Sequence, residues 1–382
     1  MTDTSRSLLT PEAQLVLLAD GRAERNGEVR RLLESDLDWK KVLTLANRER
    51  SALPLWRTVR SAGADVERME VKVLKRMAEI WEFKLLHLER LLFATLDAFH
   101  AAGVEAVLLK GAGVALSIYG GFTRRPMLDI DVLVPRDRAE EAWTLAQSLE
   151  WRWDAAGYPK AAYEEAHHLP PLMDTFGSGV GLEIHTALWM PDHPFAFSEA
   201  DVLRDAVRIE TSRGAVPVPR IEHQLLHCCI HFAWSHRIRS HAWRAFSDVR
   251  AFIEAGTIDW TEFVALARAT GAETCCYWTL RLSSSTVGNH LPPEVLRELR
   301  PSGPEALFDR LERHFMLNFM PDDVHCPSLA IEKRLWRMAI QRGKGSGGIH
   351  LPSDGAPLSF PARVAHHAQG AGAWVRYLGR LA

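Results

Sequence analysis

Two acidic residues near the middle of the chain have the types and the spacing that metal-dependent chemistry requires. Asp129 and Asp131 lie in the segment Met-Leu-Asp-Ile-Asp-Val-Leu-Val, in which acids alternate with aliphatic residues. On a β-strand this spacing points both carboxylates to one face, with their Cβ atoms roughly 6–7 Å apart. Two such carboxylates repel each other unless a cation lies between them, and Mg²⁺ prefers oxygen ligands. The pattern predicts a Mg²⁺ site, although it also occurs on strand faces that are merely solvated.

The surrounding residues favour the metal site over the solvated face. Lys110 and Gly111 follow an apolar run and precede a predicted short helix, whose free backbone N–H groups could hold a triphosphate. The side chains of Lys110, Arg124 and Arg125 could balance the phosphate charge. Glu183, in Gly-Leu-Glu-Ile-His, is the candidate for a third carboxylate. Such a carboxylate would hold a second ion and help to deprotonate a nucleophile.

Three kinds of segment must position these residues. The first hundred residues have the apolar spacing of helices, most strongly over 67–102, and Gly103 is a good stop signal. A block of short apolar runs follows, in which we expect a tight turn at 110–113, a short helix after it and a second helix over 138–149. The strands expected in this block lie at 105–109, 128–134, 151–155, 168–173 and 181–188, with a hairpin at 207–218. Helical patterns then return at 221–236, 240–255, 259–270, 272–287, 303–315 and 361–380.

The predicted organisation therefore has four parts. A helical region over 1–102 leads into an α+β core over 103–218, and a helical domain over 219–342 follows. Residues 343–382 are predicted to form a flexible linker and a terminal helix. The glycine-rich run from Gly343 to Gly348 lacks the Walker spacing, so we interpret it as linker and not as a phosphate loop.

Composition narrows the class of protein. The 382 residues carry a net charge of −2, which does not indicate wholesale electrostatic binding to nucleic acid or to anionic lipid. No apolar run has the length of a membrane span, and the first 18 residues lack the apolar centre of a signal peptide. The five cysteines form two adjacent pairs and a single residue without a CxxC spacing, which predicts free thiols. We therefore expect a cytoplasmic protein that does not contact a membrane.

Two motifs resemble those of a known family. The stretch Leu-Leu-Lys-Gly-Ala-Gly-Val-Ala-Leu, followed by Arg-Pro-Met-Leu-Asp-Ile-Asp-Val-Leu-Val, resembles the uncharacterised nucleotidyltransferase family of the polymerase-beta-like superfamily. The broader superfamily usually has Gly-Ser in the turn, so the likeness is to the branch that carries Lys-Gly. A later strand of the family usually reads Asp-x-His. Here it reads Glu183-Ile184-His185, which keeps the charge on a side chain one methylene longer.

The likeness covers roughly residues 75–260. Downstream it includes Glu222, His231, His236, Trp243 and Asp248, which resemble the helical half that follows the catalytic sheet. The resemblance implies a polymerase-beta-like nucleotidyltransferase core, a small mixed sheet with flanking helices, between helical N-terminal and C-terminal regions.

The resemblance also implies a reaction. The expected activity is transfer of a nucleoside monophosphate from an NTP, with ATP favoured, to an acceptor, with release of pyrophosphate. Asp129 and Asp131 would bind two Mg²⁺ ions, which Mn²⁺ could replace, and Glu183 would bind the ion that activates the acceptor. Lys110 and Arg125 would neutralise the triphosphate. The acceptor is unknown; a small molecule or a peptide is favoured, and tRNA remains an alternative.

Two other activities remain open on the same fold. One is an enzyme that transfers phosphate or pyrophosphate, or that modifies a peptide or protein. The other is a non-catalytic nucleotide-binding module, against which the three intact acids argue.

Several histidines and arginines have two interpretations. His223, His227 and His231 follow each other at intervals of four, which fits either a zinc or iron site or, as we favour, a polar helix face near the cleft. His185, His231, His236 and Asp248 are candidate cleft residues. Asp248 could anchor a base, a ribose or an acceptor, or form a structural pair. A basic stripe could meet an anionic acceptor, but a solvated face is favoured; its members are Arg237, Arg239, Arg244 and Arg250.

Overall fold

The computed structural model describes residues 8–19, 26–191, 193–239, 244–319, 325–340 and 371–381. The glycine-rich run at 343–348, the first ten residues of the expected helix at 361–380, and Trp243 lie outside these ranges. No helix in the described part of the chain combines the length and the low charge that crossing a bilayer requires.

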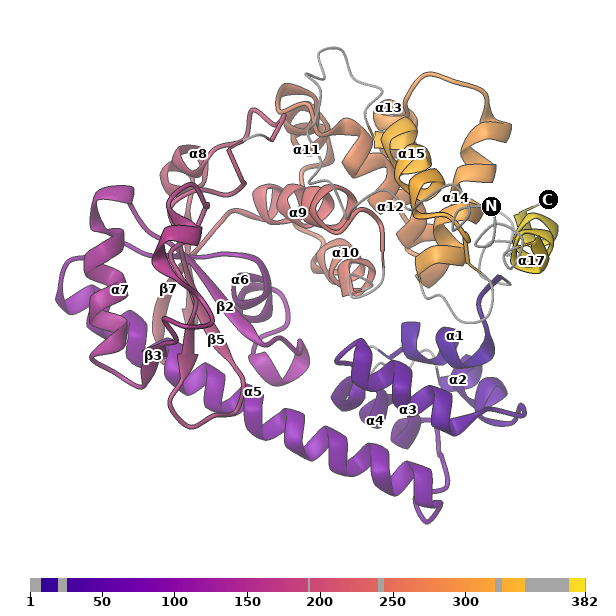
Figure 1. The fold of residues 1–382 in the computed structure, drawn as a ribbon, viewed down its shortest axis with the longest axis horizontal. Helices are drawn as coiled ribbons and strands as arrows, with labels where there is room; N and C mark the ends of the chain where they lie inside the picture. The colour runs from indigo at the N-terminus through magenta and orange to yellow at the C-terminus, as the bar shows by residue number, and fades with distance from the viewer. Residues whose placement is uncertain are drawn as a thin grey trace, which may run out of the picture.

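Helices form the N-terminal part, as the sequence predicts. The side chain of Thr10 accepts a hydrogen bond from the backbone N–H of Ala13 and caps the first helix, and Asp38 caps the third in the same way. The long fifth helix runs from this bundle to the sheet and joins the two (Figure 1). The five helices are α1 (Pro11–Leu17), α2 (Asn26–Leu33), α3 (Trp39–Arg48), α4 (Ala52–Ser61) and α5 (Met69–Ala101).

A five-stranded mixed sheet forms the core and confirms the predicted fold class. Its order is β1-β2-β5-β4-β3; the central strands β2 and β5 are parallel, and the other neighbours are antiparallel. The register places Asp131 opposite Glu183. The strands are β1 (Val107–Leu108), β2 (Asp129–Leu133), β3 (Trp151–Trp153), β4 (Leu172–Asp174) and β5 (Gly181–His185), and a separate hairpin joins β6 (Val207–Thr211) to β7 (Gly214–Val218).

The expected tight turn at 110–113 is wrong, because helix α6 (Lys110–Ser117) begins at Lys110. The N–H of Gly113 already bonds to the carbonyl of Leu109 at 3.1 Å. A Cβ on Gly113 would lie 2.6 Å from the backbone oxygen of Leu108, so the glycines allow α6 to start close against β1. Helix α7 (Ala139–Gln147) confirms the second helix expected in this block.

The remaining helices form the C-terminal part. Helix α9 (Ile221–Ile230) continues into a short π-helical segment, η6 (His231–Ser235), a departure from α-helix that is frequent at functional sites. Three helices are absent from the sequence prediction: α8 (Glu199–Arg204), α13 (Pro293–Leu299) and α15 (Leu329–Ile340). The others are α9 (Ile221–Ile230), α10 (Arg244–Ala255), α11 (Trp260–Ala269), α12 (Glu273–Val287), α14 (Glu305–Phe319) and α17 (Ala371–Leu381).

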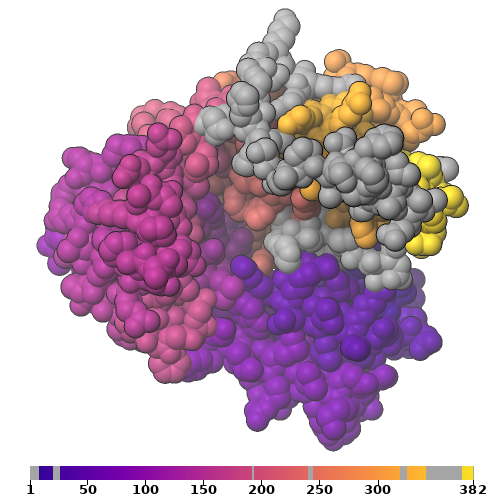
Figure 2. Space-filling model, in the orientation of Figure 1, coloured from indigo at the N-terminus to yellow at the C-terminus, as the bar shows by residue number. Residues whose placement is uncertain are grey.

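Two large hydrophobic cores organise these elements. The first joins the N-terminal helices to the C-terminal helices and includes Leu17, Phe246 and Trp278. The second lies between the sheet and α5, where Ile130 and Val132 turn away from the two aspartates and are fully buried. The N-terminal helices therefore contact both other parts, and Figure 2 shows a recess between them (indigo) and the core (magenta).

Candidate active site

The predicted metal ligands meet at the centre of the sheet. Asp129 and Asp131 lie on β2, and Glu183 lies beside Asp131 on β5. One oxygen of Asp131, Oδ1, accepts hydrogen bonds from Lys110 Nζ at 2.6 Å and from His185 Nε2 at 2.8 Å. Each of Asp131, Glu183 and His185 offers a ligand atom within 4.8 Å of the other two, the only such group of metal-ligating side chains among the described residues.

These carboxylates have different electrostatic environments. Burial alone would raise the pKa of Asp131, but Lys110 and His185 together hold that pKa well below its usual range. Asp129 is exposed to the cavity, yet the surrounding protein reduces its solvation; this effect and the nearby charges of Asp131 and Glu183 raise its pKa. A bound cation would remove the repulsion among these acids.

Lys110 is held in an unusual backbone conformation. Its φ of +41° lies in the left-handed region that non-glycine residues rarely adopt. The ammonium group contacts Asp131, and burial, which alone would lower the pKa of Lys110, is outweighed by the charges of Asp131 and Glu183, which raise it. The sequence suggested Lys110 as a phosphate ligand; the structure places its side chain on Asp131, one of the predicted metal ligands.

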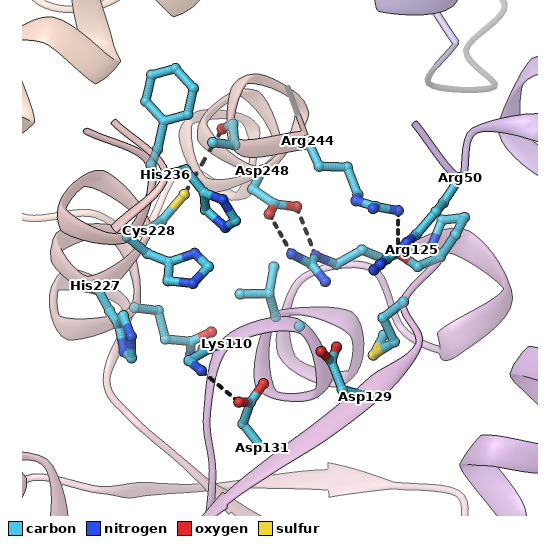
Figure 3. Close-up of a pocket in the computed structure, with 18 of the residues that line it drawn as sticks. Arg50, Lys110, Arg125, Asp129, Asp131, His227, Cys228, His236, Arg244 and Asp248 are labelled. Atoms are coloured by element: carbon cyan, nitrogen blue, oxygen red, sulfur yellow. Dashed lines mark hydrogen bonds and ion pairs between the residues drawn. The ribbon is translucent and has the colours of Figure 1, made fainter. Parts of the chain in front are cut away.

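Arg125 and Asp248 form a buried ion pair that spans two parts of the protein. Arg125 donates from Nε to Oδ1 of Asp248 at 2.9 Å and from Nη2 to Oδ2 at 2.7 Å. Tyr119 donates to the same Oδ1 at 3.1 Å. Both members of the pair line the cavity, but their charged atoms are directed at each other (Figure 3). Of the two roles left open for Asp248, the structure shows the structural pair.

Gly111 leaves room for this pair. A Cβ at Gly111 would lie 2.6 Å from Arg125 Nη1 and 3.3 Å from Met127 Sδ. Since Asp248 fixes the guanidinium, Gly111→Ala is expected to lower the free energy of unfolding by about 1–3 kcal/mol, measured by denaturant titration. Gly27→Ala is the control, because a Cβ at that helical position meets nothing within 4 Å. Equal stability of the two variants would show that Arg125 moves aside without cost.

A cavity of about 380 Å³ opens over the carboxylates. Its walls come from the N-terminal helices, from the sheet core and from the C-terminal helices. The three guanidinium groups of Arg50, Arg125 and Arg244 lie on one side of it, and His227 and His236 lie on the other (Figure 3). Its size suits a small ligand. Its described lining includes Asp129, Asp131, Glu183, Lys110, Gly111, Gln224, Cys228, His231 and Asp248.

Arg50 is a cavity residue that the sequence did not reveal. It lies between α3 and α4, far from the motifs in sequence, with a φ of +55°. Its half-buried guanidinium has no hydrogen bond or ion pair with another described residue. Only its charge and its position in a short loop could have been noticed from the sequence, and neither indicates a site.

Arg244 was considered from the sequence only as part of a basic surface stripe. It instead points into the cavity and donates a hydrogen bond to the carbonyl of Pro126. Burial, together with the charges of Arg125 and Arg50, lowers its pKa to about 10. The favoured interpretation, a solvated stripe, is therefore wrong for this residue, whereas Arg239 and Arg250 pair with acids outside the cavity.

The histidines on α9 and directly after it do not form one group. His223 accepts a hydrogen bond from Arg220 at 3.0 Å and lies away from the cavity, whereas His227, His231 and His236 line it. The rings of His231 and His236 meet edge to face at 4.5 Å, an arrangement set by the π-helical segment between them. Burial, aided by the charge of Lys110, lowers the pKa of His227 to about 3, so this imidazole is neutral at pH 7.

Arg124 lies apart from the other predicted residues. It is exposed and lines a smaller adjoining pocket, not the main cavity. Its Nη1 reaches the carbonyl of Tyr119 at 3.4 Å. The structure thus brings together every predicted site residue except Arg124 around the carboxylates, with His185 beneath Asp131 as a buried hydrogen-bond donor.

Comparison with known proteins identifies the family of the chain. A search of curated proteins found no match. A family model described as uncharacterised nucleotidyltransferase matches residues 35–288, which cover the sheet, all the cavity residues named above and most of the helices around them. The chain therefore belongs to the uncharacterised nucleotidyltransferase family.

Proposed function

We propose that this protein transfers a nucleoside monophosphate from an NTP to an acceptor, and that it needs divalent cations to do so. The observation that carries the proposal is the meeting of three carboxylates from two parallel strands at the floor of a cavity with arginines on one wall. Acids at the floor and cations above them suit a ligand that presents both metal ions and phosphates.

The residues present fit Mg²⁺ or Mn²⁺. Asp129, Asp131 and Glu183 supply oxygen ligands. Burial and, after it, the charges of Asp131 and Glu183 raise the pKa of Asp129, and acids that lie this close to one another suit a bound cation. When bound, such ions supply charge neutralisation at the phosphates and at the acceptor oxygen. Ionised Asp131 can only accept hydrogen bonds, so His185 Nε2 carries a proton and orients that carboxylate.

The side chains above the floor have separate tasks. Lys110 holds Asp131 ionised, and the Arg125–Asp248 pair keeps the cavity wall in place. Arg50 and Arg244 are the cations that we assign to the triphosphate, since their charges face the cavity without a carboxylate partner among the described residues. Neutral His227 and His231 offer hydrogen bonds to the uncharged sugar or base.

The position of a label in the product separates nucleotidyl transfer from phosphate transfer. ATP labelled at the α or at the γ phosphate is incubated with the protein, Mg²⁺ or Mn²⁺ and a small-molecule extract. Nucleotidyl transfer attaches the α label alone and releases pyrophosphate. Attachment of the γ label would instead support a phosphate-transferring enzyme, and binding of ATP without any product would support the non-catalytic module.

Arg50→Ala is expected to weaken ATP binding about 10- to 100-fold, the effect of losing one charge-assisted hydrogen bond or ion pair. Calorimetric titration with ATP and Mg²⁺ measures the affinity. Arg124→Ala is the matched control, because it removes the same charge from the neighbouring pocket outside the main cavity. If Arg124→Ala alone weakened ATP binding, the triphosphate would lie near Arg124, as the sequence suggested. That result would refute the assignment of Arg50 to the triphosphate.

A further inference from the structure

A second pocket lies next to the carboxylates. Its volume is about 320 Å³, and its walls come from β2, β4, β5 and the segment between β3 and β4. Asp129 and Glu183 line both this pocket and the main cavity. The two spaces therefore meet at two of the predicted metal ligands.

The two spaces differ in chemistry. Four cationic side chains line the main cavity: Arg50, Lys110, Arg125 and Arg244. No lysine or arginine occurs among the described residues that line the second pocket. Its walls instead include the rings of Tyr158, Tyr163 and His168 and the thioether of Met173, and the Tyr163 and His168 rings lie 5.4 Å apart.

In-line transfer requires two separate spaces. The acceptor oxygen must approach the α phosphorus from the side opposite the leaving pyrophosphate. If the triphosphate lies along the arginines of the main cavity, the acceptor must reach the carboxylates from another direction. The second pocket provides such a direction, because it opens onto Asp129 and Glu183.

We propose that the second pocket binds the acceptor, and that this acceptor is an uncharged small molecule with a hydroxyl group on an aromatic or apolar body. This inference rests on the proposed nucleotidyl transfer. The hydroxyl oxygen forms a bond to the α phosphorus, the bond from that phosphorus to the bridging oxygen breaks, and pyrophosphate leaves with the electron pair. The hydroxyl proton passes to the carboxylate of Glu183, which reaches both spaces.

The lining selects this class of acceptor. Tyrosine rings and a methionine bind flat apolar groups through stacking and sulfur–aromatic contacts. A phosphorylated metabolite or the backbone of tRNA would bring negative charge to a pocket whose described lining offers no cationic partner. The volume lies at the low end of the range for small-molecule sites, so a small compound fits better than a macromolecule.

Two probes of similar size test the inference without knowledge of the natural acceptor. The probes are 4-hydroxybenzyl alcohol, which is neutral, and phenyl phosphate, which is anionic. Saturation-transfer NMR on the full chain, with ATP and Ca²⁺ present to fill the nucleotide side, detects binding of each probe. Met173→Trp fills the pocket and Tyr163→Ala removes one wall. The controls, Met69→Trp and Phe176→Ala, change exposed residues outside both pockets.

The wild-type protein is expected to bind the alcohol and not the phosphate. Met173→Trp should abolish that signal, Tyr163→Ala should weaken affinity about tenfold, and the controls should retain it. Thermal unfolding checks that each variant is folded; Tyr163 is half-exposed, so its variant stays informative if Met173→Trp is unstable. Equal binding of phenyl phosphate, or alcohol binding unchanged in both pocket variants, would overturn the inference.

The outcome is separable from that of the proposed function. Transfer of the α label to an acceptor that continues in folded Met173→Trp and Tyr163→Ala would refute the acceptor pocket and leave nucleotidyl transfer standing. Absence of ATP binding in the wild type, with the alcohol still bound, would refute nucleotidyl transfer itself.

Discussion

Replacing Asp131 by asparagine is expected to lower the rate of nucleotidyl transfer about a thousandfold, since the charge stabilisation that metal ions supply is worth several kcal/mol. Asp131 is buried at the centre of the site, and its Oδ1 is shared by Lys110 and His185. An amide keeps the shape but removes the charge that a cation needs. It also leaves the ammonium of Lys110 facing a neutral group, so cation binding falls further. Transfer of the α label, measured over a range of Mg²⁺ and Mn²⁺ concentrations, gives the rate.

The control separates loss of the site from loss of the fold. Asp137→Asn makes the same change on the exposed segment η4 (Arg136–Arg138), which does not line the cavity, and should leave the rate unchanged. Asp129→Asn provides a second test, because that side chain is exposed to the cavity and carries no structural hydrogen bond among those the structure records. Full metal-dependent activity in a folded Asp131→Asn protein would refute the assignment of the metal site.

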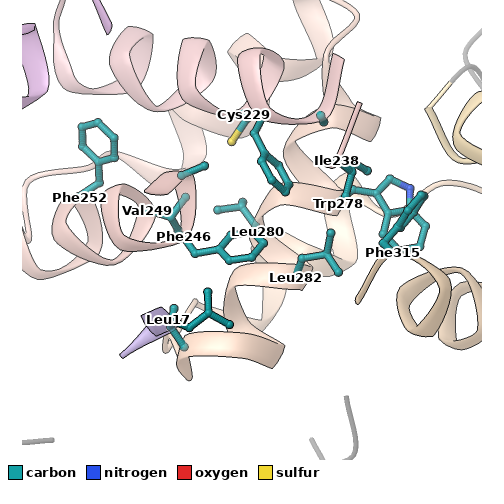
Figure 4. Close-up of a cluster of buried hydrophobic side chains, with 14 of the residues drawn as sticks. Leu17, Cys229, Ile238, Phe246, Val249, Phe252, Trp278, Leu280, Leu282 and Phe315 are labelled. Atoms are coloured by element: carbon teal, nitrogen blue, oxygen red, sulfur yellow. The ribbon is translucent and has the colours of Figure 1, made fainter. Parts of the chain in front are cut away.

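Asp248→Asn is expected to lower the free energy of unfolding by about 3–5 kcal/mol, the usual effect of breaking a buried ion pair by removal of one charge. The variant leaves the guanidinium of Arg125 buried without a counter-charge. A guanidinium keeps its proton in a protein, so the buried charge cannot be removed by deprotonation. Helix α10 itself should persist, because Phe246, Val249 and Phe252 pack in the hydrophobic core (Figure 4). Chemical denaturation measures the difference.

An exposed arginine–carboxylate pair that is also joined by two hydrogen bonds is the control for this prediction. Arg90 also binds Glu150 through two hydrogen bonds, at 2.6 and 2.7 Å, but about half of each side chain is exposed. Glu150→Gln should therefore change the free energy of unfolding by about 1 kcal/mol or less. If Asp248→Asn were as mild, burial would not be what makes the Arg125–Asp248 pair important.

Local patterns in the sequence were sufficient to place the two aspartates on one face of a strand. The period of two along a strand places Asp129 and Asp131 on one face and Ile130 and Val132 on the other, and β2 follows this rule. Glu183 was predicted as the third carboxylate because it lies in a short run of residues typical of a strand, Gly-Leu-Glu-Ile-His. These inferences depend on neighbours within a few residues, so backbone geometry alone decides them.

Element boundaries were less accurate. The expected strand at 105–109 shortens to β1, and the turn at 110–113 is the first turn of α6. Packing causes both changes, because Gly111 and Gly113 bring the helix within contact of Arg125 and of the β1 backbone. A glycine in the sequence shows that the backbone can turn or can approach another element closely. Which of the two occurs depends on the element that packs against it.

The sequence by itself predicted three acids on strands as candidate metal ligands, because side-chain direction on a strand follows from its two-residue repeat. That the strands β2 and β5 are neighbours, with Asp131 opposite Glu183, was decided by the tertiary structure. The tertiary structure alone decided the partners of the cations. Arg125 pairs with Asp248, 123 residues away, Lys110 turns to Asp131, and Arg50 reaches the cavity from the N-terminal helices. A long, flexible cationic side chain can face many directions, and the acid or phosphate that it meets depends on how distant segments pack. The carboxylates were therefore predictable from the sequence, and the partners of the arginine and lysine side chains around them were not.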